Sequence, residues 1–259
     1  MKVIEPGPLL REAADVLGPR WTDAVLIGAA ALQALLADDV GADGGAAAAD
    51  DGAVVFIAAT RDVDLAIEAR IADDLVRHLE AAQMRPSEVE GERGFTWVRG
   101  DLKIQLVRPF HPFPRGAAAG LPTSPQLSLL NEEQHRFTVG FASEPAEPRL
   151  QVASTAAFVA LKQLAFGRAR YDGPPVERDY HDVYAIIASR PNEFEQSYRA
   201  ANNHVRELAN RALEALAASG GETAAAARQH AETTGNQDIA SHARAIQRAA
   251  VFMQRRLGY

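Results

Sequence analysis

Residues 60–67 read TRDVDLAI, and this stretch decides how the rest of the chain is interpreted. In an apolar run that predicts a strand, Asp62 and Asp64 lie two residues apart, so their side chains point to one face and those of Val63 and Leu65 to the other. Two carboxylates about 7 Å apart repel each other unless a cation, a proton or solvent lies between them. The pair therefore predicts either a solvated strand face or a cation-binding site.

Composition limits the class of protein. The 259 residues are 47% hydrophobic and 24% charged, with a formal net charge of -7 and no cysteine. This length suffices for one large domain or two small ones. The lack of cysteine excludes disulfides and thiolate metal sites, and the negative charge disfavours whole-molecule attraction to nucleic acid. Because no run has the pattern of a signal peptide or a membrane span, we expect a cytoplasmic protein with no membrane partner.

The pattern of apolar residues changes near residue 152. Before it, short strand and helix patterns alternate. We expect helices at 9–17, 29–36 and 73–84, and strands at 24–27, 53–60 (running into the DVDL segment), 95–100, 102–110, 135–140 and 149–153. The strands at 95–100 and 102–110 predict a hairpin around Gly100-Asp101. Residues 38–52 hold no side chain larger than valine, which predicts a mobile loop. After residue 153 the pattern is helical, with helices at 154–167 and 179–188 and two long helices near 193–218 and 223–257.

These patterns predict an α+β fold, with a mixed β-sheet domain over residues 1–152 and an all-helical domain over residues 153–259. Within the first domain, Gly28 separates the strand at 24–27 from a helix whose N-terminal N–H groups could face a phosphate. We expect the two aspartates at the far end of a strand pair from this turn.

Lys162 is the only charged residue between Leu150 and Gly167, and it has a phenylalanine four residues away on each side. Burying an unpaired ammonium costs several kcal/mol, so the side chain either reaches water along the rings or meets an anion. The candidates are an anionic ligand in a cleft and a carboxylate of the next helix, Asp179 or Asp182. We favour the ligand, although two aspartates in a first helical turn are also favoured by the helix dipole.

Taken in order, four segments resemble the nucleotidyltransferase superfamily, and within it the AbiEii-type toxin family. They are LIGAAAL (26–32), TRDVDL (60–65), FVALKQLAFGRAR (158–170) and RDYHDVYAI (178–186). The resemblance covers about residues 24–188. It implies an enzyme that uses Mg²⁺ or Mn²⁺ to transfer a nucleotide from a nucleoside triphosphate to a nucleic acid such as tRNA, or to a protein. It further implies a toxin role, a cognate antitoxin as partner, and a helical domain that completes the active-site cleft.

The same resemblance implies roles by position. Asp62 and Asp64 are the expected metal ligands, Lys162 the phosphate contact, and Asp179 the acid of the later motif. The expected nucleotide-binding positions are Gly28, Ala29, Ala30, Thr60 and Lys162.

Some residues depart from the family pattern. Ala29 and Ala30 stand where the family has glycine, serine or threonine, and Gln105 stands where many members have a third carboxylate. Asp179 either supplies that third acid or the acid is absent. Two alternatives follow: a degenerate fold that binds without turnover, and a small-molecule adenylyltransferase of the antibiotic-modifying kind. The acidic net charge favours the second, whereas converging arginines of the helical half would favour RNA: Arg199, Arg206, Arg211, Arg244, Arg248, Arg255 and Arg256.

Overall fold

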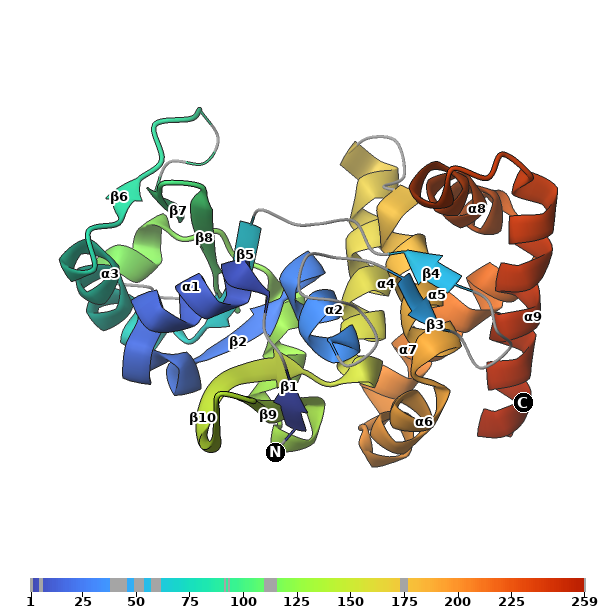
Figure 1. The fold of residues 1–259 in the computed structure, drawn as a ribbon, viewed down its shortest axis with the longest axis horizontal. Helices are drawn as coiled ribbons and strands as arrows, with labels where there is room; N and C mark the ends of the chain where they lie inside the picture. Colours follow the sequence, from blue (N-terminus) through green and yellow to red (C-terminus); the bar gives the residue numbers. More distant parts are fainter. Residues whose placement is uncertain are drawn as a thin grey trace. The chain divides into compact units, whose positions relative to one another are not determined.

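The structure is a computed structural model that describes residues 2–4, 7–37, 46–48, 54–56, 62–90, 92, 94–109, 116–172 and 177–258. The chain divides into two compact units. Met1–Asp38 and Ala59–Ala153 form the first, and Asp39–Ala58 and Ser154–Tyr259 form the second (Figure 1). The predicted division after residue 152 lies one residue from the observed one. The prediction did not place residues 39–58 with the second unit.

Among the described residues of the first unit, eight strands form one sheet in the order β1-β9-β10-β2-β5-β8-β7-β6. Their bounds are β1 Lys2–Ile4, β2 Ala24–Ile27, β5 Asp62–Ile67, β6 Arg85–Pro86, β7 Thr96–Arg99, β8 Leu102–Val107, β9 Arg136–Phe141 and β10 Glu144–Ala153. The β1–β9, β10–β2 and β5–β8 pairs are parallel, and the other pairs are antiparallel. The predicted mixed sheet, and with it the α+β class, is confirmed.

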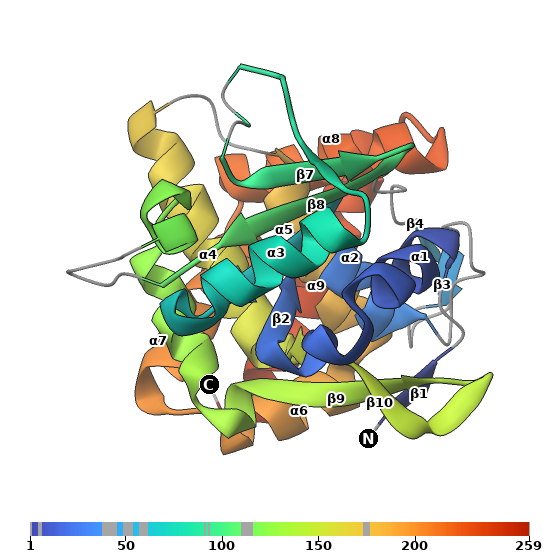
Figure 2. The same cartoon turned by 90° about the vertical axis from the view of Figure 1, so that its left-hand side faces the viewer.

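Three α-helices accompany the sheet in the described part of this unit: α1 (Pro8–Leu17), α2 (Gly28–Leu36) and α3 (Ala72–Ala81). Helix α2 packs against β2, β5 and β10, whereas α1 packs against β5, β8 and α3. Figure 2 looks onto α3, β7 and β8, which lie at one side of the unit. The predicted β7–β8 hairpin is confirmed, and Gly100 in its turn has a φ of +58°, a conformation that glycine adopts without strain.

In its described residues, the second unit contains six helices and a short hairpin. The helices are α4 Thr155–Asp172, α5 Glu177–Ser189, α6 Pro191–Ala200, α7 Asn203–Ala217, α8 Gly221–Thr234 and α9 Ile239–Leu257. Their apolar faces form a core to which Phe158, Phe194 and Leu213 contribute fully buried side chains. Strands β3 (Ala46–Ala48) and β4 (Val54–Phe56) pair with each other, and β4 packs against α5 and α8.

Two sequence predictions about this unit are wrong. Residues 46–48 form a strand within the segment predicted to be a loop, and the remainder of residues 38–52 lies outside the described residues. The strand predicted over 53–60 does not continue into DVDL within one sheet, because β4 pairs with β3 whereas β5 pairs with β2 and β8. Residues 57–61 lie outside the described residues.

The two long helices predicted at the C-terminal end are four shorter ones. Asn202 ends the first run, because its side chain accepts a hydrogen bond from the Val205 backbone N–H at 2.9 Å and so begins α7. Gly235 ends the second run in a left-handed conformation at φ +69°. Asp238 then caps α9 by accepting from the Ser241 N–H at 3.0 Å. Each break uses a residue that favours helix ends.

None of the helices in the part of the chain that the structure describes is both long enough and apolar enough to cross a membrane.

Candidate functional site

The alternation predicted for the DVDL segment is present in β5. Val63 and Leu65 are fully buried, whereas Asp62 and Asp64 are partly exposed on the opposite face. β5 lies in the interior of the sheet, between β2 and β8, so the two carboxylates occupy a position supported on both sides by neighbouring strands. A strand held in this way fixes the direction of its side chains better than a loop would.

Gly28 lies against Asp64. In the antiparallel β2–β5 pair, Ile27 is opposite Asp64, so α2 begins beside the aspartate. Gly28 has a φ of +66°, and a Cβ atom at this position would lie 2.2 Å from Asp64 Oδ2. Both the backbone conformation and the close carboxylate therefore require glycine. The expectation that the aspartates lie far from this turn is wrong, because antiparallel pairing brings the end of β2 to the start of β5.

Ile27, the N-cap residue of α2, provides no side-chain hydrogen bond to the first turn of the helix. A carboxylate beside a helix N-terminus is stabilised by the helix dipole, so Asp64 has a structural role whether or not it binds a metal. Ala30 is fully buried, so its side chain is out of reach of a ligand. Ala29 is partly exposed, and Thr60, another predicted nucleotide-binding position, lies outside the described residues.

Strand β8 completes the polar face. In the parallel β5–β8 pair, Gln105 is opposite Asp64 and Lys103 is opposite Asp62. The neighbour of Asp64 on the next strand is therefore an amide and not a third carboxylate. Across the described residues, no group of three or more His, Cys, Asp or Glu side chains is arranged to hold a metal ion. Sequence reasoning missed Lys103, although the alternation in LKIQLV marks it as sharing a face with Gln105.

In the second unit, Lys162 is paired with two carboxylates. Its ammonium donates a hydrogen bond to Asp179 Oδ1 at 2.7 Å and forms an ion pair with Asp182 Oδ2 at 2.7 Å. The Lys162 and Asp179 side chains are each 13% exposed and that of Asp182 is 4% exposed. The ammonium also lies 5.6 Å from the centre of the Phe158 ring. Of the two partners considered from the sequence, the carboxylates of the next helix are confirmed and not the favoured ligand, because α5 brings both aspartates to α4.

The two carboxylates favour the charged form of Lys162. Burial by itself lowers the pKa of Lys162, but the carboxylates of Asp182 and Asp179 outweigh burial and raise that pKa above its ordinary value. The cluster carries two negative charges and one positive charge, with little exposure to solvent. It therefore joins α4 to α5 by a charged contact whose members depend on one another.

A row of histidines on α5, α8 and α9 was not anticipated from the sequence. His181 Nε2 and His230 Nδ1 are 3.2 Å apart and both rings are buried. The His242 ring meets the His230 ring edge-on, with 4.7 Å between their centres. Burial, and then the neighbouring rings of His181 and His242, lower the pKa of His230 to about 4. These residues are 49 and 12 positions apart in sequence, which left no local pattern to detect.

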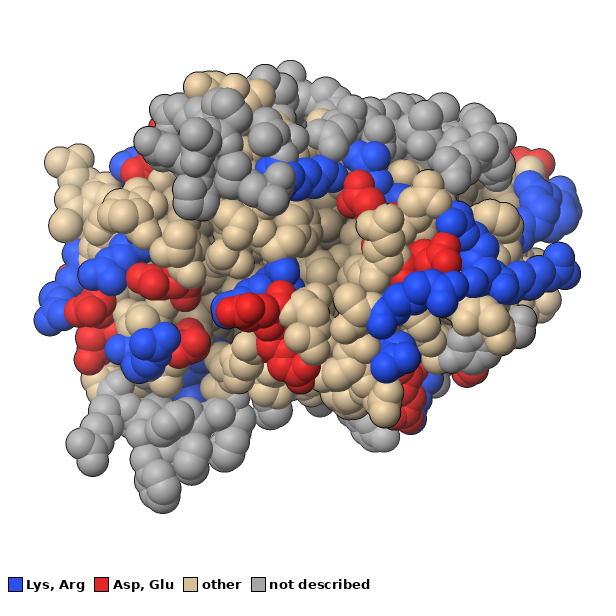
Figure 3. Space-filling model, turned by 90° about the horizontal axis from the view of Figure 1, so that it is seen from below, with Lys and Arg blue, Asp and Glu red and all other residues tan. Residues whose placement is uncertain are grey.

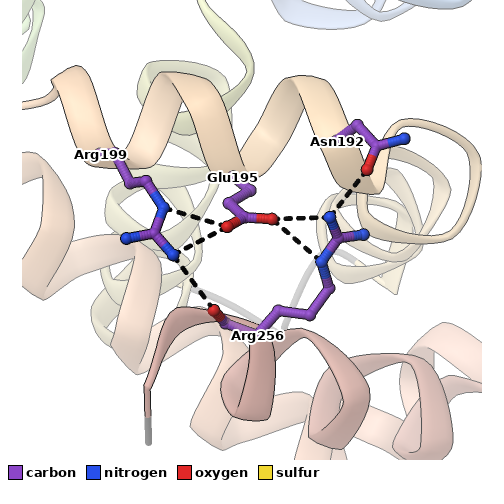
Figure 4. A network of polar contacts seen from close by, with 4 residues as sticks. All are labelled: Asn192, Glu195, Arg199 and Arg256. Atoms are coloured by element: carbon purple, nitrogen blue, oxygen red, sulfur yellow. Dashed lines mark hydrogen bonds and ion pairs between the residues drawn. The ribbon is translucent and has the colours of Figure 1, made fainter.

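Six of the seven arginines singled out in the helical half fall into two groups. Arg199 and Arg256 both bind Glu195, and Arg256 also donates to Asn192 Oδ1, which ties α6 to the last turn of α9 (Figure 4). Arg211 pairs with Glu207. On the face drawn in Figure 3, blue and red side chains are interspersed, so much of the basic surface is locally neutralised.

The other group lies along α9. Arg244, Arg248 and Arg255 are exposed and make no ion pair within the described residues, and they share one helix face with Phe252. Phe252 is 50% exposed, and the Arg256 guanidinium lies 5.6 Å from the centre of its ring. Helix α9 contains no Asp or Glu, so it is a basic element in an acidic chain. Arg206, the seventh arginine singled out in the sequence, donates to Asn203 Oδ1 at 3.0 Å.

Comparison with known proteins gives a likeness of fold. No protein-family model matches the chain, and no curated protein matches it. Among solved structures, the chain is similar to JHP933 from Helicobacter pylori, known from a crystal structure, with 12% sequence identity and a TM-score of 0.50. The similarity covers 96% of this chain and 90% of that one. At this identity, the comparison shows that the two chains share an α+β fold over nearly their whole lengths.

Proposed function

We propose that the protein is a metal-dependent nucleotidyltransferase. One observation carries the proposal: Asp62 and Asp64 share a face of an interior strand, and Asp64 lies against the glycine that opens α2. In the reaction, an acceptor hydroxyl oxygen forms a bond to the α-phosphorus of a nucleoside triphosphate. The bond from that phosphorus to the bridging oxygen breaks, pyrophosphate leaves with the electron pair, and the hydroxyl proton passes to water.

The residues present fit a Mg²⁺ or Mn²⁺ ion. Mg²⁺ takes oxygen ligands and is usually held by one or two carboxylates together with substrate phosphates, which matches a pair of aspartates whose neighbour is an amide. A bound ion would neutralise charge on the triphosphate. The backbone N–H groups at the start of α2, whose N-cap residue Ile27 has no polar side chain, are suited to a phosphate oxygen. Thr60 and Lys162 are assigned to the nucleotide, and Asp179 to catalysis, by the family resemblance alone.

The acceptor that we propose is a nucleic acid, such as tRNA. Support comes from the exposed face of α9, where three arginines without ion pairs in the described residues accompany an exposed phenylalanine. Arginines bind phosphates, and an aromatic ring provides a stacking surface for a base. A toxin role in the cytoplasm, restrained by an antitoxin, is part of the same proposal and rests on the family resemblance.

A second candidate function is nucleotide binding without turnover. Gln105 favours it, because the position beside Asp64 holds an amide where a third carboxylate would assist deprotonation of the acceptor. A small-molecule adenylyltransferase is a further alternative. The net charge of -7 suits a small-molecule acceptor better than an RNA acceptor, which carries negative charge itself.

Calorimetry with nucleoside triphosphates, in the presence and absence of Mg²⁺ or Mn²⁺, tests the binding step. We expect nucleotide affinity that depends on the metal, and Asp64→Ala should abolish that dependence. Asp101→Ala, which removes an exposed carboxylate from the β7–β8 turn, is the matched control and should leave it intact. Equal, metal-independent binding by wild type and Asp64→Ala would reject the proposal.

The acceptor is tested by incubation with labelled nucleotide, metal and total tRNA. Label transferred to RNA identifies the enzyme proposed, and metal-dependent binding without transfer to RNA, protein or an antibiotic identifies the binding protein. The double variant Arg244→Glu/Arg248→Glu should reduce transfer to RNA at least about tenfold while nucleotide binding is unchanged. Arg211→Glu, at an arginine that already pairs with Glu207, is the matched control and should have a smaller effect.

A further inference from the structure

Lys103 lies on the polar face of the sheet beside Asp62. The two residues are opposite each other in the parallel β5–β8 pair, and neighbouring strands are about 4.8 Å apart. Ile104, the next residue of β8, is fully buried on the other face, as Val63 is in β5. On β5 and β8, both described in full, Lys103 is the only basic residue, so it is the cation nearest to the two carboxylates along these strands.

The Lys103 side chain is held from the side away from β5. Its ammonium donates to Glu92 Oε1 at 3.2 Å, and Glu92 Oε2 accepts a hydrogen bond from the buried Ser87 hydroxyl at 2.7 Å. The hydrogen bonds from Ser87 and Lys103 lower the pKa of Glu92, so Glu92 remains a carboxylate at neutral pH. An ammonium has three N–H donors and Glu92 accepts one of them. The Lys103 side chain is 36% exposed, which leaves it accessible to a ligand.

A triphosphate bound with its metal at Asp62 and Asp64 would bring several negative charges to a face that already carries two carboxylates. One divalent ion does not neutralise all of them, and a fixed cation at this place would stabilise both the bound triphosphate and the departing pyrophosphate. Lys162, the phosphate contact expected from the sequence, is already paired with two aspartates. Lys103, on the strand next to the two aspartates, is placed for this role.

We propose that Lys103 binds a phosphate oxygen of the nucleotide, and that Glu92, anchored by Ser87, positions its ammonium beside Asp62. This inference rests on the proposed nucleotidyltransferase function. A lysine in this role should affect the affinities for the metal ion and for the triphosphate in opposite directions, which a purely structural lysine would not do. The ammonium repels a free metal ion and attracts a triphosphate.

The test measures two affinities for each variant of the full-length chain. Binding of Mn²⁺ alone is followed by electron paramagnetic resonance, and binding of a Mg²⁺ complex of an α,β-methylene nucleotide, which is not turned over, by calorimetry. Lys103→Met should weaken nucleotide binding at least about tenfold, as expected for a lost charge-assisted hydrogen bond. The same variant should bind Mn²⁺ about threefold more tightly at low salt. Lys103→Arg should retain both affinities.

Lys2→Met is the matched control, because Lys2 lies on β1, four strands from β5 in the sheet, and its loss should change neither affinity. Lys103→Gln provides a second neutral variant should Lys103→Met fail to fold. Unchanged nucleotide affinity in the neutral variants, or a parallel loss of Mn²⁺ and nucleotide binding, would overturn the role proposed for Lys103. Either result would leave the proposed function standing. A wild-type chain without metal-dependent nucleotide binding would overturn both this inference and the proposed function.

Discussion

At the scale of single residues, Lys162 is the position where packing changes the expected result of a substitution. Because Asp182 is almost fully buried and Asp179 largely so, Lys162→Met leaves two carboxylates without their cation. Removing one partner of a buried ion pair typically costs about 3–5 kcal/mol, so we expect the free energy of unfolding at neutral pH to fall by about 3 kcal/mol. Denaturant unfolding of wild type and variant measures the change directly.

Two comparisons sharpen this test. The double variant Lys162→Met/Asp182→Asn should recover part of the lost stability, because it removes the more deeply buried of the two carboxylates that lost their cation. Melting with and without nucleotide and metal then shows whether Lys162 also contacts the ligand. If nucleotide and metal raise the melting temperature of Lys162→Met as much as that of wild type, this lysine does not contact the ligand. If Lys162→Met without ligand melts at or above the wild-type temperature, the structural role assigned here is contradicted.

At the scale of elements, the break between α6 and α7 depends on one amide side chain. Asn202→Ala removes the hydrogen bond to the Val205 N–H and leaves that donor at the start of α7 without its cap. Loss of an N-cap costs about 1 kcal/mol, and chemical denaturation should show a decrease of that size. Asn202→Asp, which preserves an acceptor at the cap, should remain near wild type. Asn203→Ala, at the exposed neighbouring position, should change stability by less than about half as much, and an equal loss would contradict the capping role.

At the scale of the whole molecule, His230 makes the stability of the protein depend on pH. Its pKa is about 4 in the folded chain and about 6.5 when unfolded. Between these values the unfolded chain binds a proton that the folded chain does not. The contribution of His230 to the free energy of unfolding is therefore fully present above about pH 6.5 and falls as the pH is lowered towards 4. Below about pH 4 this group causes no further decrease. The total contribution is up to about 3 kcal/mol.

Unfolding free energies measured from pH 7 to pH 4 check this contribution. His230→Gln should be less stable at pH 7 but should show a shallower decrease on acidification, because it lacks the group that protonates on unfolding. His204→Gln, at an exposed position of α7, should retain the wild-type slope. Parallel profiles for wild type and His230→Gln would contradict the assignment, and the titration of the His230 ring can be followed independently by nuclear magnetic resonance.

The sequence by itself determined the features that depend on local pattern. Alternation with a period of two placed Asp62 and Asp64 opposite Val63 and Leu65, and Gly100 marked the β7–β8 turn. The change from alternating to helical spacing located the end of the sheet within one residue of the observed division. Such patterns are readable because side-chain direction follows from the backbone geometry of each element.

Tertiary structure decided which of these residues meet. Strand order and register placed Gly28 beside Asp64 and Lys103 beside Asp62, and helix packing brought Asp179 and Asp182 to Lys162. The same local patterns are compatible with many pairings, and one is selected only when the apolar faces of distant segments are buried together. The sequence therefore determined which side chains are polar and which way they point, and long-range packing determined their partners, because the free energy of burial is shared among residues far apart in the chain.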